Sequence, residues 1–141
     1  MANEAVITEL LGNNGDRISF TIADGVAGTN IAKGTLMVLT DPRTIIAHAA
    51  VDTPFAGILA HEKKGGDGNT TASVITNCIA KLTVKAGGNA ITIGDTCSLS
   101  SVANCVELAA TLDDEKGFSV GHSLEDGAAG NTAFVRVHAL S

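Results

Sequence analysis

Hydrophobic and polar residues alternate along much of this chain with the two-residue period of a β-strand. The clearest case is residues 17–22, where Ile18, Phe20 and Ile22 share one face and the polar residues between them share the other. Residues 55–60 are instead apolar almost throughout, which is typical of a strand buried on both faces. Sustained helical periodicity is nowhere visible. The pattern therefore predicts an all-β fold.

Turn residues divide the chain into about ten short strand signals at a spacing of roughly 8 to 12 residues, which favours a compact β-sandwich or a partly open β-barrel. Besides the two segments above, the pattern predicts strands at 34–39, 43–51, 71–85, 95–100, 105–110, 118–124 and 132–140. Alanines within 43–51 leave a short helix as the alternative there.

Three features of the sequence recur in the same order at nearly constant spacing, which indicates two related half-units. The recurring features are residues 31–40 with 91–100, Phe55-Ala56-Gly57 with Phe118-Ser119-Val120-Gly121, and Gly68-Asn69-Thr70 with Gly130-Asn131-Thr132, at offsets of 60, 63 to 64, and 62 residues. We place the half-units at about 31–85 and 91–140.

The first residues form a separate segment. Apolar side chains at 6, 7, 10 and 11 lie among polar neighbours, and the turn cluster Gly12-Asn13-Asn14-Gly15 follows. We therefore expect an N-terminal arm or edge strand at residues 1–15 and a single β domain at 16–141. The chain of 141 residues is long enough to bury about 68% of its unfolded surface.

Composition limits the classes of partner. The net charge is −6, which opposes binding to a nucleic-acid backbone. The chain has no Tyr or Trp, so the usual stacking platforms for bases and sugars are missing. The core must then consist of Val, Ile, Leu and Ala, with the four phenylalanines as its largest members, namely Phe20, Phe55, Phe118 and Phe134.

Targeting signals are missing from the pattern as well. The chain begins without a basic segment followed by a long apolar one, and it contains no run of 18 apolar residues. We expect a soluble protein that is made in a cytoplasm and has no membrane partner.

Candidate metal and cofactor residues form no recognisable set. The three cysteines have no C-x-x-C spacing, and Cys97 and Cys105 flank a turn across which they could form a disulfide or remain buried thiols. The four histidines lack metal-ligand spacing. Residues 113–115 are all acidic but lack the features of an EF-hand, so we interpret them as a solvated turn. We expect no metal and no cofactor.

Catalytic motifs are also missing. There is no Gly-x-Ser-x-Gly elbow, and the glycine-rich residues 65–70 lack the Gly-Lys-Ser/Thr ending of a phosphate loop and are interpreted as a hairpin tip. We therefore expect a protein that is not an enzyme and takes no small-molecule substrate. A small hydrolase is the third hypothesis, and the sequence nominates no residue for it.

Several motifs together resemble the capsid decoration, or cement, proteins of tailed bacteriophages. They are Gly-Thr-Leu-Met-Val-Leu at 34–39, Phe-Ala-Gly-Ile-Leu-Ala at 55–60, Ile-Thr-Ile-Gly-Asp at 91–95, Val-Gly-His-Ser-Leu-Glu at 120–125 and Thr-Ala-Phe-Val-Arg-Val at 132–137. The resemblance covers roughly residues 17–140. It implies a β-tulip-like domain on the outside of an icosahedral shell, commonly a trimer, often with an N-terminal arm across neighbouring capsid subunits, and no catalytic residues.

This resemblance leads to a functional hypothesis. We expect a virion protein on the outer capsid surface that binds the major capsid protein, forms a homotrimer and stabilises the expanded shell. The alternative is a host-surface module that binds a glycan, which the lack of Tyr and Trp disfavours. The capsid-interface candidates are the residues of the N-terminal segment that would add a strand to a neighbouring sheet edge, namely Glu4, Val6, Ile7, Thr8 and Leu10.

Overall fold

The computed structural model describes residues 3–23, 29–109 and 118–139, and in these ranges the chain is built from β-strands. The strands are β1 (Val6–Leu10), β2 (Ile18–Ile22), β3 (Leu36–Asp41), β4 (Thr44–Ala47), β5 (Phe55–Leu59), β6 (Thr71–Ile75), β7 (Asn77–Val84), β8 (Thr96–Leu99), β9 (Cys105–Leu108), β10 (Ser119–Ser123) and β11 (Thr132–His138). The predicted all-β fold is confirmed.

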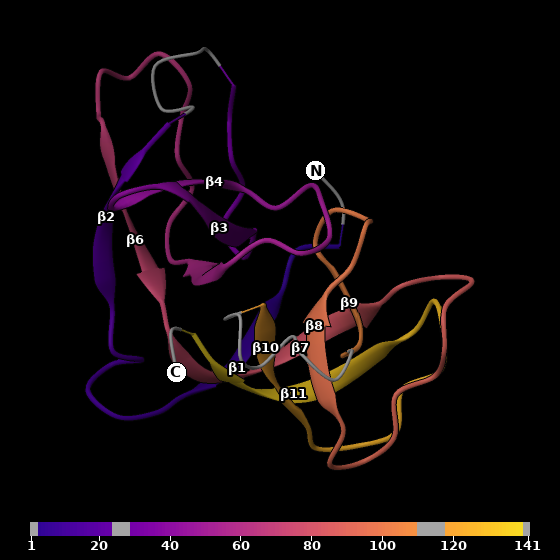
Figure 1. The fold of residues 1–141 in the computed structure, drawn as a ribbon. Helices are drawn as coiled ribbons and strands as arrows, with labels where there is room; N and C mark the ends of the chain where they lie inside the picture. Colours follow the sequence, from indigo (N-terminus) through magenta and orange to yellow (C-terminus); the bar gives the residue numbers. More distant parts are fainter. Residues whose placement is uncertain (1–2, 24–28, 110–117, 140–141) are drawn as a thin grey trace.

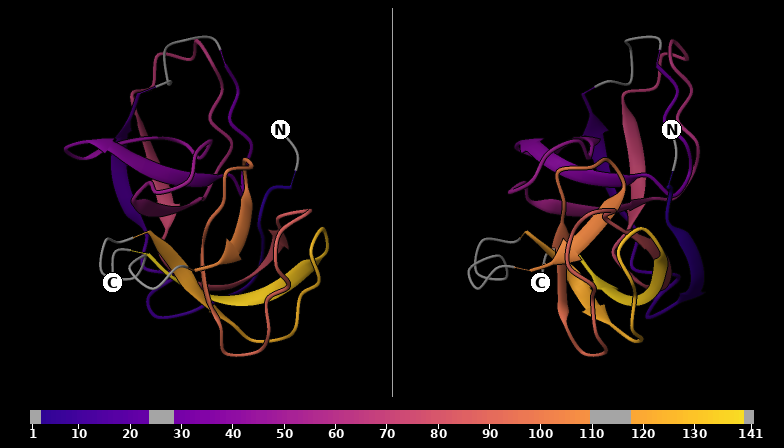
Figure 2. Two further views of the ribbon diagram at one scale, coloured as in Figure 1. Left: turned by 45° about the vertical axis from the view of Figure 1, so that its right-hand side comes forward. Right: turned by 90° about the vertical axis from the view of Figure 1, so that its right-hand side faces the viewer.

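The strands form two small barrels of five strands each. In the first, the order β2-β4-β3-β5-β6 closes on itself. In the second, the order β7-β11-β10-β8-β9 is closed by the pairing of β7 with β9, and β1 adds to the outside of β7. Figure 1 shows the first barrel in indigo to magenta and the second in red to yellow, and the two views of Figure 2 show the same two bodies packed against each other.

The two barrels share one topology, as the repeated motifs predict. The antiparallel pairs β3–β4, β3–β5, β5–β6 and β2–β6 have counterparts in β8–β9, β8–β10, β10–β11 and β7–β11. Each barrel closes through one parallel pair, β2–β4 or β7–β9. Gly34 and Gly94, 60 positions apart, have φ angles of 89° and 87°, which L side chains rarely adopt. The glycines of the motif therefore mark equivalent turns.

The strand bounds place the repeat differently from the motif spacing. The barrel strands span residues 18–75 and 77–138, whereas the motifs suggested half-units of about 31–85 and 91–140. The predicted single strand 71–85 is wrong, because Thr76 separates β6 of the first barrel from β7 of the second. Residues 44–47 form a strand, which settles the alternative of a short helix there. The division into an arm (1–15) and a domain (16–141) stays a prediction.

Two apolar cores hold the molecule together. The smaller one fills the first barrel and includes Phe20 and Leu59, and the larger one fills the second barrel and continues between the barrels. Strand β5 contributes to both cores, with Phe55 and Ile58 in the larger one, so all five of its residues are buried as predicted. Phe118 and Phe134 are only partly buried, so the expectation that all four phenylalanines lie in the core is wrong for those two.

A polar cluster is buried where the barrels meet. The backbone N–H of His48 donates to the carbonyl of Leu36 at 2.8 Å, and the backbone N–H of Leu36 donates to Oδ1 of Asn104 at 3.0 Å. The backbone N–H of Asn104 in turn lies 3.2 Å from Nδ1 of His48, and Nε2 of His48 lies 2.7 Å from the carbonyl of Ser100. Because Nδ1 accepts from an N–H and Nε2 faces a carbonyl, the imidazole is neutral with its proton on Nε2.

Candidate interaction surface around strand β1

Strand β1 is an edge strand of the second barrel's sheet. Its residues pair with β7 from Val6 opposite Lys81 to Leu10 opposite Cys78, with a bulge between Ile7 and Glu9. Its other edge has no strand partner among the strands that the structure describes. An edge of this kind exposes backbone N–H and C=O groups that can pair with another chain. The N-terminal segment, expected as an arm or an edge strand, thus lies in the sheet of its own chain.

The five predicted interface residues lie in different environments. Val6 and Leu10 are 58% and 41% exposed, so they present apolar surface to solvent. Thr8 is exposed and donates its hydroxyl hydrogen to the carbonyl of Ile79 at 3.0 Å. Ile7 packs against the larger core, and Glu4 is partly buried beside the turn at Gly34. Val6, Thr8 and Leu10 are thus the exposed members of the five. Because of the bulge, Val6 lies opposite Lys81 and Leu10 opposite Cys78, on different faces of the sheet. The role of all five at a capsid interface stays a prediction.

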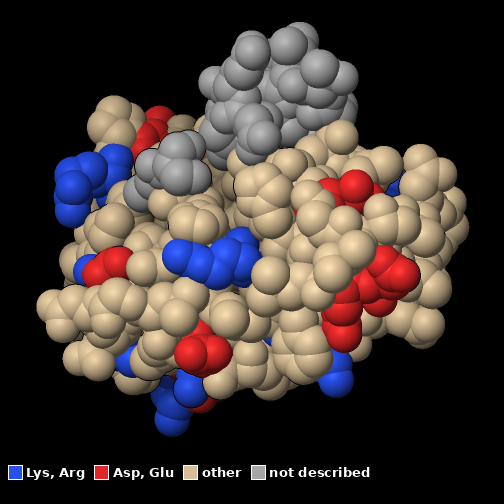
Figure 3. Space-filling view, turned by 90° about the horizontal axis from the view of Figure 1, so that it is seen from below, with Lys and Arg blue, Asp and Glu red and all other residues tan. Residues whose placement is uncertain are grey.

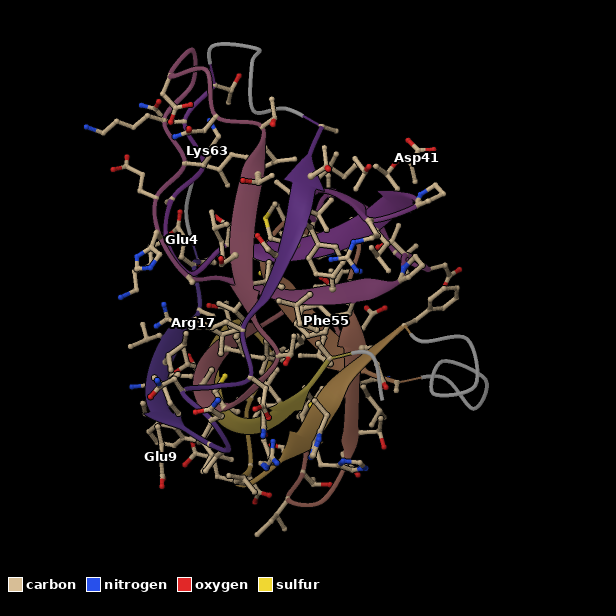
Figure 4. All side chains as sticks on the ribbon, turned by 90° about the vertical axis from the view of Figure 1, so that its left-hand side faces the viewer. Glu4, Glu9, Arg17, Asp41, Phe55 and Lys63 are labelled. Carbon is tan, nitrogen blue, oxygen red and sulfur yellow. The ribbon has the colours of Figure 1, made fainter. Side chains whose placement is uncertain are left out.

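A shallow groove of about 240 Å³ runs between β1 and the first barrel. Residues 7–10 form one wall, and the other is formed by Arg17, Lys33, Ala60, His61 and Ile75. Nη1 of Arg17 lies 3.2 Å from Nε2 of His61, so a hydrogen bond joins these two residues of the same wall. Figure 4 shows Arg17 and Glu9 on the side of the molecule where β1 lies. The groove thus adds charged and polar groups beside the apolar surface of β1.

Charged side chains do not form a large patch of one sign in the view of Figure 3, where Lys and Arg alternate with Asp and Glu on a mostly uncharged surface. The ion pairs between described residues are Lys63 with Asp67, at 2.5 Å, and Lys85 with Glu107, at 3.8 Å. The first pair closes the glycine-rich loop after β5, and the backbone N–H of Asn69 also donates to Asp67 there. The predicted hairpin tip is therefore held by an ion pair and a hydrogen bond within the loop itself.

The cysteine side chains are buried thiols. Cys97 lies opposite Leu108 in the β8–β9 register, three positions from Cys105, and all three cysteines are free. A disulfide between Cys97 and Cys105 is therefore not formed. Burial raises the pKa of the Cys78 thiol to about 11 and that of Cys97 to about 12, so both stay protonated at neutral pH. Neither is an activated nucleophile.

Metal ligands are not gathered anywhere in residues 3–23, 29–109 and 118–139, where no group of three or more His, Cys, Asp or Glu could hold an ion. The acidic residues 113–115 lie outside the described residues. Within the described part of the chain, no helix is long and apolar enough to cross a membrane.

Comparison with known proteins gives matches among solved structures but none in sequence. No protein-family model matches the chain, and no curated protein is similar to it in sequence. Among solved structures, the chain is similar to the head fiber gp8.5 N base of bacteriophage phi29, with 12% sequence identity and a TM-score of 0.48 over 86% of this chain and 92% of that one. The description as a head fiber base belongs to the phi29 protein.

Sequence reasoning missed the buried polar cluster at His48. The sequence suggests ordinary surface or strand positions for the histidines, whereas His48 is fully buried between the barrels. The sequence gives no clear signal for this burial apart from the two alanines that flank His48. Its partners Ser100 and Asn104 are 52 and 56 positions away, so no local motif links them.

Proposed function

We propose that the protein is a capsid decoration protein that binds the outer surface of an icosahedral phage head and stabilises the expanded shell by bridging major capsid protein subunits. The observation that carries this proposal is β1, an edge strand with an open backbone edge and exposed apolar side chains at Val6 and Leu10. A surface of this kind is suited to pairing with a strand of another protein.

The physical role of such a protein is mechanical. A protein that bridges two shell subunits adds interface area that must be lost before the subunits separate. We further propose that it acts as a homotrimer, because several linked contacts bind far more tightly than one contact alone. The sequence motifs that resemble decoration proteins support the assignment to a phage head, and they lie on β3, β5, β10 and β11 and in the turn before β8.

Deleting residues 1–10 would be a poor test of this surface. The deletion would remove Ala5 and Ile7 from the larger core and would leave the edge of β7 unpaired. A variant that fails to bind could then simply be unfolded. Substitution of an exposed residue avoids this problem, because surface changes usually alter stability by less than about 0.5 kcal/mol.

We expect Val6→Asp to weaken binding to expanded, undecorated capsids by about tenfold or more, because a charged carboxylate would replace an apolar side chain and would have to lose its water in the interface. The measurement is co-sedimentation at a series of protein concentrations. The matched control is Ile93→Asp, since Ile93 is 70% exposed and lies on the turn before β8. Equal capsid occupancy by wild type and Val6→Asp would exclude β1 as the interface.

A further inference from the structure

Strand β2 of the first barrel has an edge that no described strand covers, and this edge is equivalent to the one that β1 covers on the second barrel. The equivalence follows from the closing strand pairs. Thr21 lies opposite Thr44 in the β2–β4 pair, and Thr83 lies opposite Cys105 in the β7–β9 pair. Thr21 therefore corresponds to Thr83, an offset of 83 − 21 = 62 positions.

On the second barrel, the edge before Thr83 is covered. β9 pairs with only two residues of β7, and β1 continues along the same side of β7 over Cys78 to Lys81. The backbone N–H of Val84 donates to the carbonyl of Asn131, which shows that the even-numbered residues of β7 form their backbone hydrogen bonds with β11. The odd-numbered residues Ile79 and Lys81 therefore direct their backbone N–H and C=O groups to the other side, toward β1. Thus β1 pairs with the short stretch of the β7 edge that β9 leaves unpaired.

On the first barrel, the corresponding residues are Arg17 and Ser19, each 62 positions before its counterpart. The backbone N–H of Ile22 donates to the carbonyl of Thr70, which shows that the even-numbered residues of β2 form their backbone hydrogen bonds with β6. Ser19, and Arg17 immediately before β2, therefore direct their backbone groups to the other side. There β4 pairs only with Thr21 and Ile22, and no described strand continues along the edge. Both Arg17 and Ser19 are exposed.

Two arginines flank this edge without a carboxylate partner among the described residues. Arg43, at the β3–β4 turn, donates from Nη2 to the carbonyl of Ser19 at 2.9 Å, and its guanidinium lies 5.6 Å from the centre of the Phe20 ring. Arg17 bonds to His61. The nearby Asp16 carboxylate is already bonded to Asn77 and to the backbone of Asn13, and these bonds lower its pKa. A surface hollow of about 480 Å³ adjoins the edge and is lined by Asn13, Asn14, Asp16, Arg17, Ile18 and Thr76.

We propose that the Arg17–Ser19 edge of β2 binds an extended, acidic segment of the shell subunit as an added strand. The backbone of that segment would replace the Arg43 side chain on the carbonyl of Ser19, and the released guanidinium would pair with a carboxylate of the segment. The shell subunit as the source rests on the function proposed above. The strand that covers the equivalent edge of β7 has the same acidic character, because residues 4–10 carry Glu4 and Glu9 and no basic residue.

A second copy of this chain is a poorer occupant. Its β1 would have to leave the edge of its own β7 in order to pair with β2 of a neighbour. Such an exchange would open as many strand edges as it closed, so it would gain no net backbone hydrogen bonds. A strand from a different protein closes the β2 edge and opens none.

The test uses a peptide of residues 4–11 as a surrogate strand, because this sequence pairs with the equivalent edge of β7. It is added to the isotopically labelled full-length protein, and backbone amide shifts and hydrogen exchange are followed. We expect the amides of Arg17 and Ser19 to shift and to exchange more slowly. A peptide with Glu4→Lys and Glu9→Lys should bind about tenfold more weakly or worse, because it places cations against the arginines.

Two protein variants complete the test. Ser19→Pro removes the exposed N–H donor of the edge, a substitution that edge strands tolerate, and it should abolish the response. Arg43→Gln should weaken it by about fivefold or more, which also keeps the proposal testable if the proline variant fails to fold. The control is Lys81→Gln, because Lys81 lies beside β1 on the other barrel, with its ammonium 5.7 Å from the centre of the Phe134 ring.

Three results would overturn the proposal. They are shifts confined to Ile79 and Lys81, an unchanged response in both edge variants, and a self-association of the wild type that Ser19→Pro removes. Parallel co-sedimentation with capsids separates this inference from the function on which it rests. Capsid binding that Ser19→Pro and Arg43→Gln leave unchanged would overturn only the inference, whereas a wild type that ignores capsids would overturn the decoration function.

Discussion

Replacing Gly121 with alanine is expected to lower the free energy of unfolding by about 3 kcal/mol or more. A Cβ atom at Gly121 would overlap the carbonyl oxygen of Arg136 and would lie 2.9 Å from its carbonyl carbon. Both atoms belong to the backbone of β11, which pairs with β7 on its other side. Relief of the clash therefore requires β10, which carries Gly121, to move away from β11.

Urea denaturation followed by circular dichroism measures this effect. The matched control is Gly88→Ala, because a Cβ there would meet its nearest atom at 3.5 Å, an ordinary contact. We expect the control to remain within about 1 kcal/mol of the wild type. Gly57, 64 positions before Gly121, should behave like Gly121, since its Cβ would lie 2.9 Å from the carbonyl oxygen of Ile75. A fully stable Gly121→Ala variant would show that the strand packing of the second barrel is described wrongly.

Replacing His48 with alanine is expected to cost about 3 kcal/mol of stability. The substitution removes a buried ring and leaves the backbone N–H of Asn104 and the carbonyl of Ser100 without their partners. Both partners lie in the turn between β8 and β9, whereas His48 follows β4 of the other barrel. The loss should therefore loosen the contact between the barrels, and urea denaturation measures it. A loss below about 0.5 kcal/mol would contradict this role of His48.

The same histidine should make stability depend on pH. Burial lowers the pKa of His48 below its usual value. As pH falls below about 6.5, the unfolded chain therefore binds a proton that the folded chain does not, and the free energy of unfolding decreases by up to about 1.4 kcal/mol per pH unit until the folded pKa is reached. The contribution is fully present above about pH 6.5.

A comparison of wild type with His48→Gln between pH 7.5 and 5.5 isolates this effect. The pKa of His138 is also lowered, by burial and by the nearby Arg136 and His122, so it contributes in the same direction in both proteins. We expect the wild type to lose more stability than the variant over this range. An identical loss in the two proteins would show that His48 is not the group responsible.

The parts of the fold that could be predicted from sequence are those that depend on local pattern. Alternation in residues 17–22 gave the strand and its buried face, and the apolar run 55–60 gave a strand buried on both sides. The matched positions of Gly34 and Gly94 indicated the repeat, because each turn needs a left-handed residue. These signals act within a few residues of one another.

The features that could not be predicted depend on contacts between distant parts of the chain. Each half closes into its own barrel through one parallel strand pair, β2–β4 or β7–β9. The alternation of apolar and polar residues does not show which strands pair in this way. Thr76 looked like the middle of one strand because the apolar pattern continues through it. In the candidate site, the exposure of Val6 and the partial burial of Ile7 became clear only once the partner of β1 was known to be β7.

The central claim is that this protein binds the outer surface of a phage head. The most direct measurement is co-sedimentation of the full chain with expanded, undecorated capsids over a range of protein concentrations. The account predicts that the bound amount rises to a plateau with a fixed number of copies per shell. Part of this binding should persist at moderate salt, because salt does not screen the contacts of the exposed apolar side chains Val6 and Leu10. Protein that pellets no more with capsids than without them would contradict it.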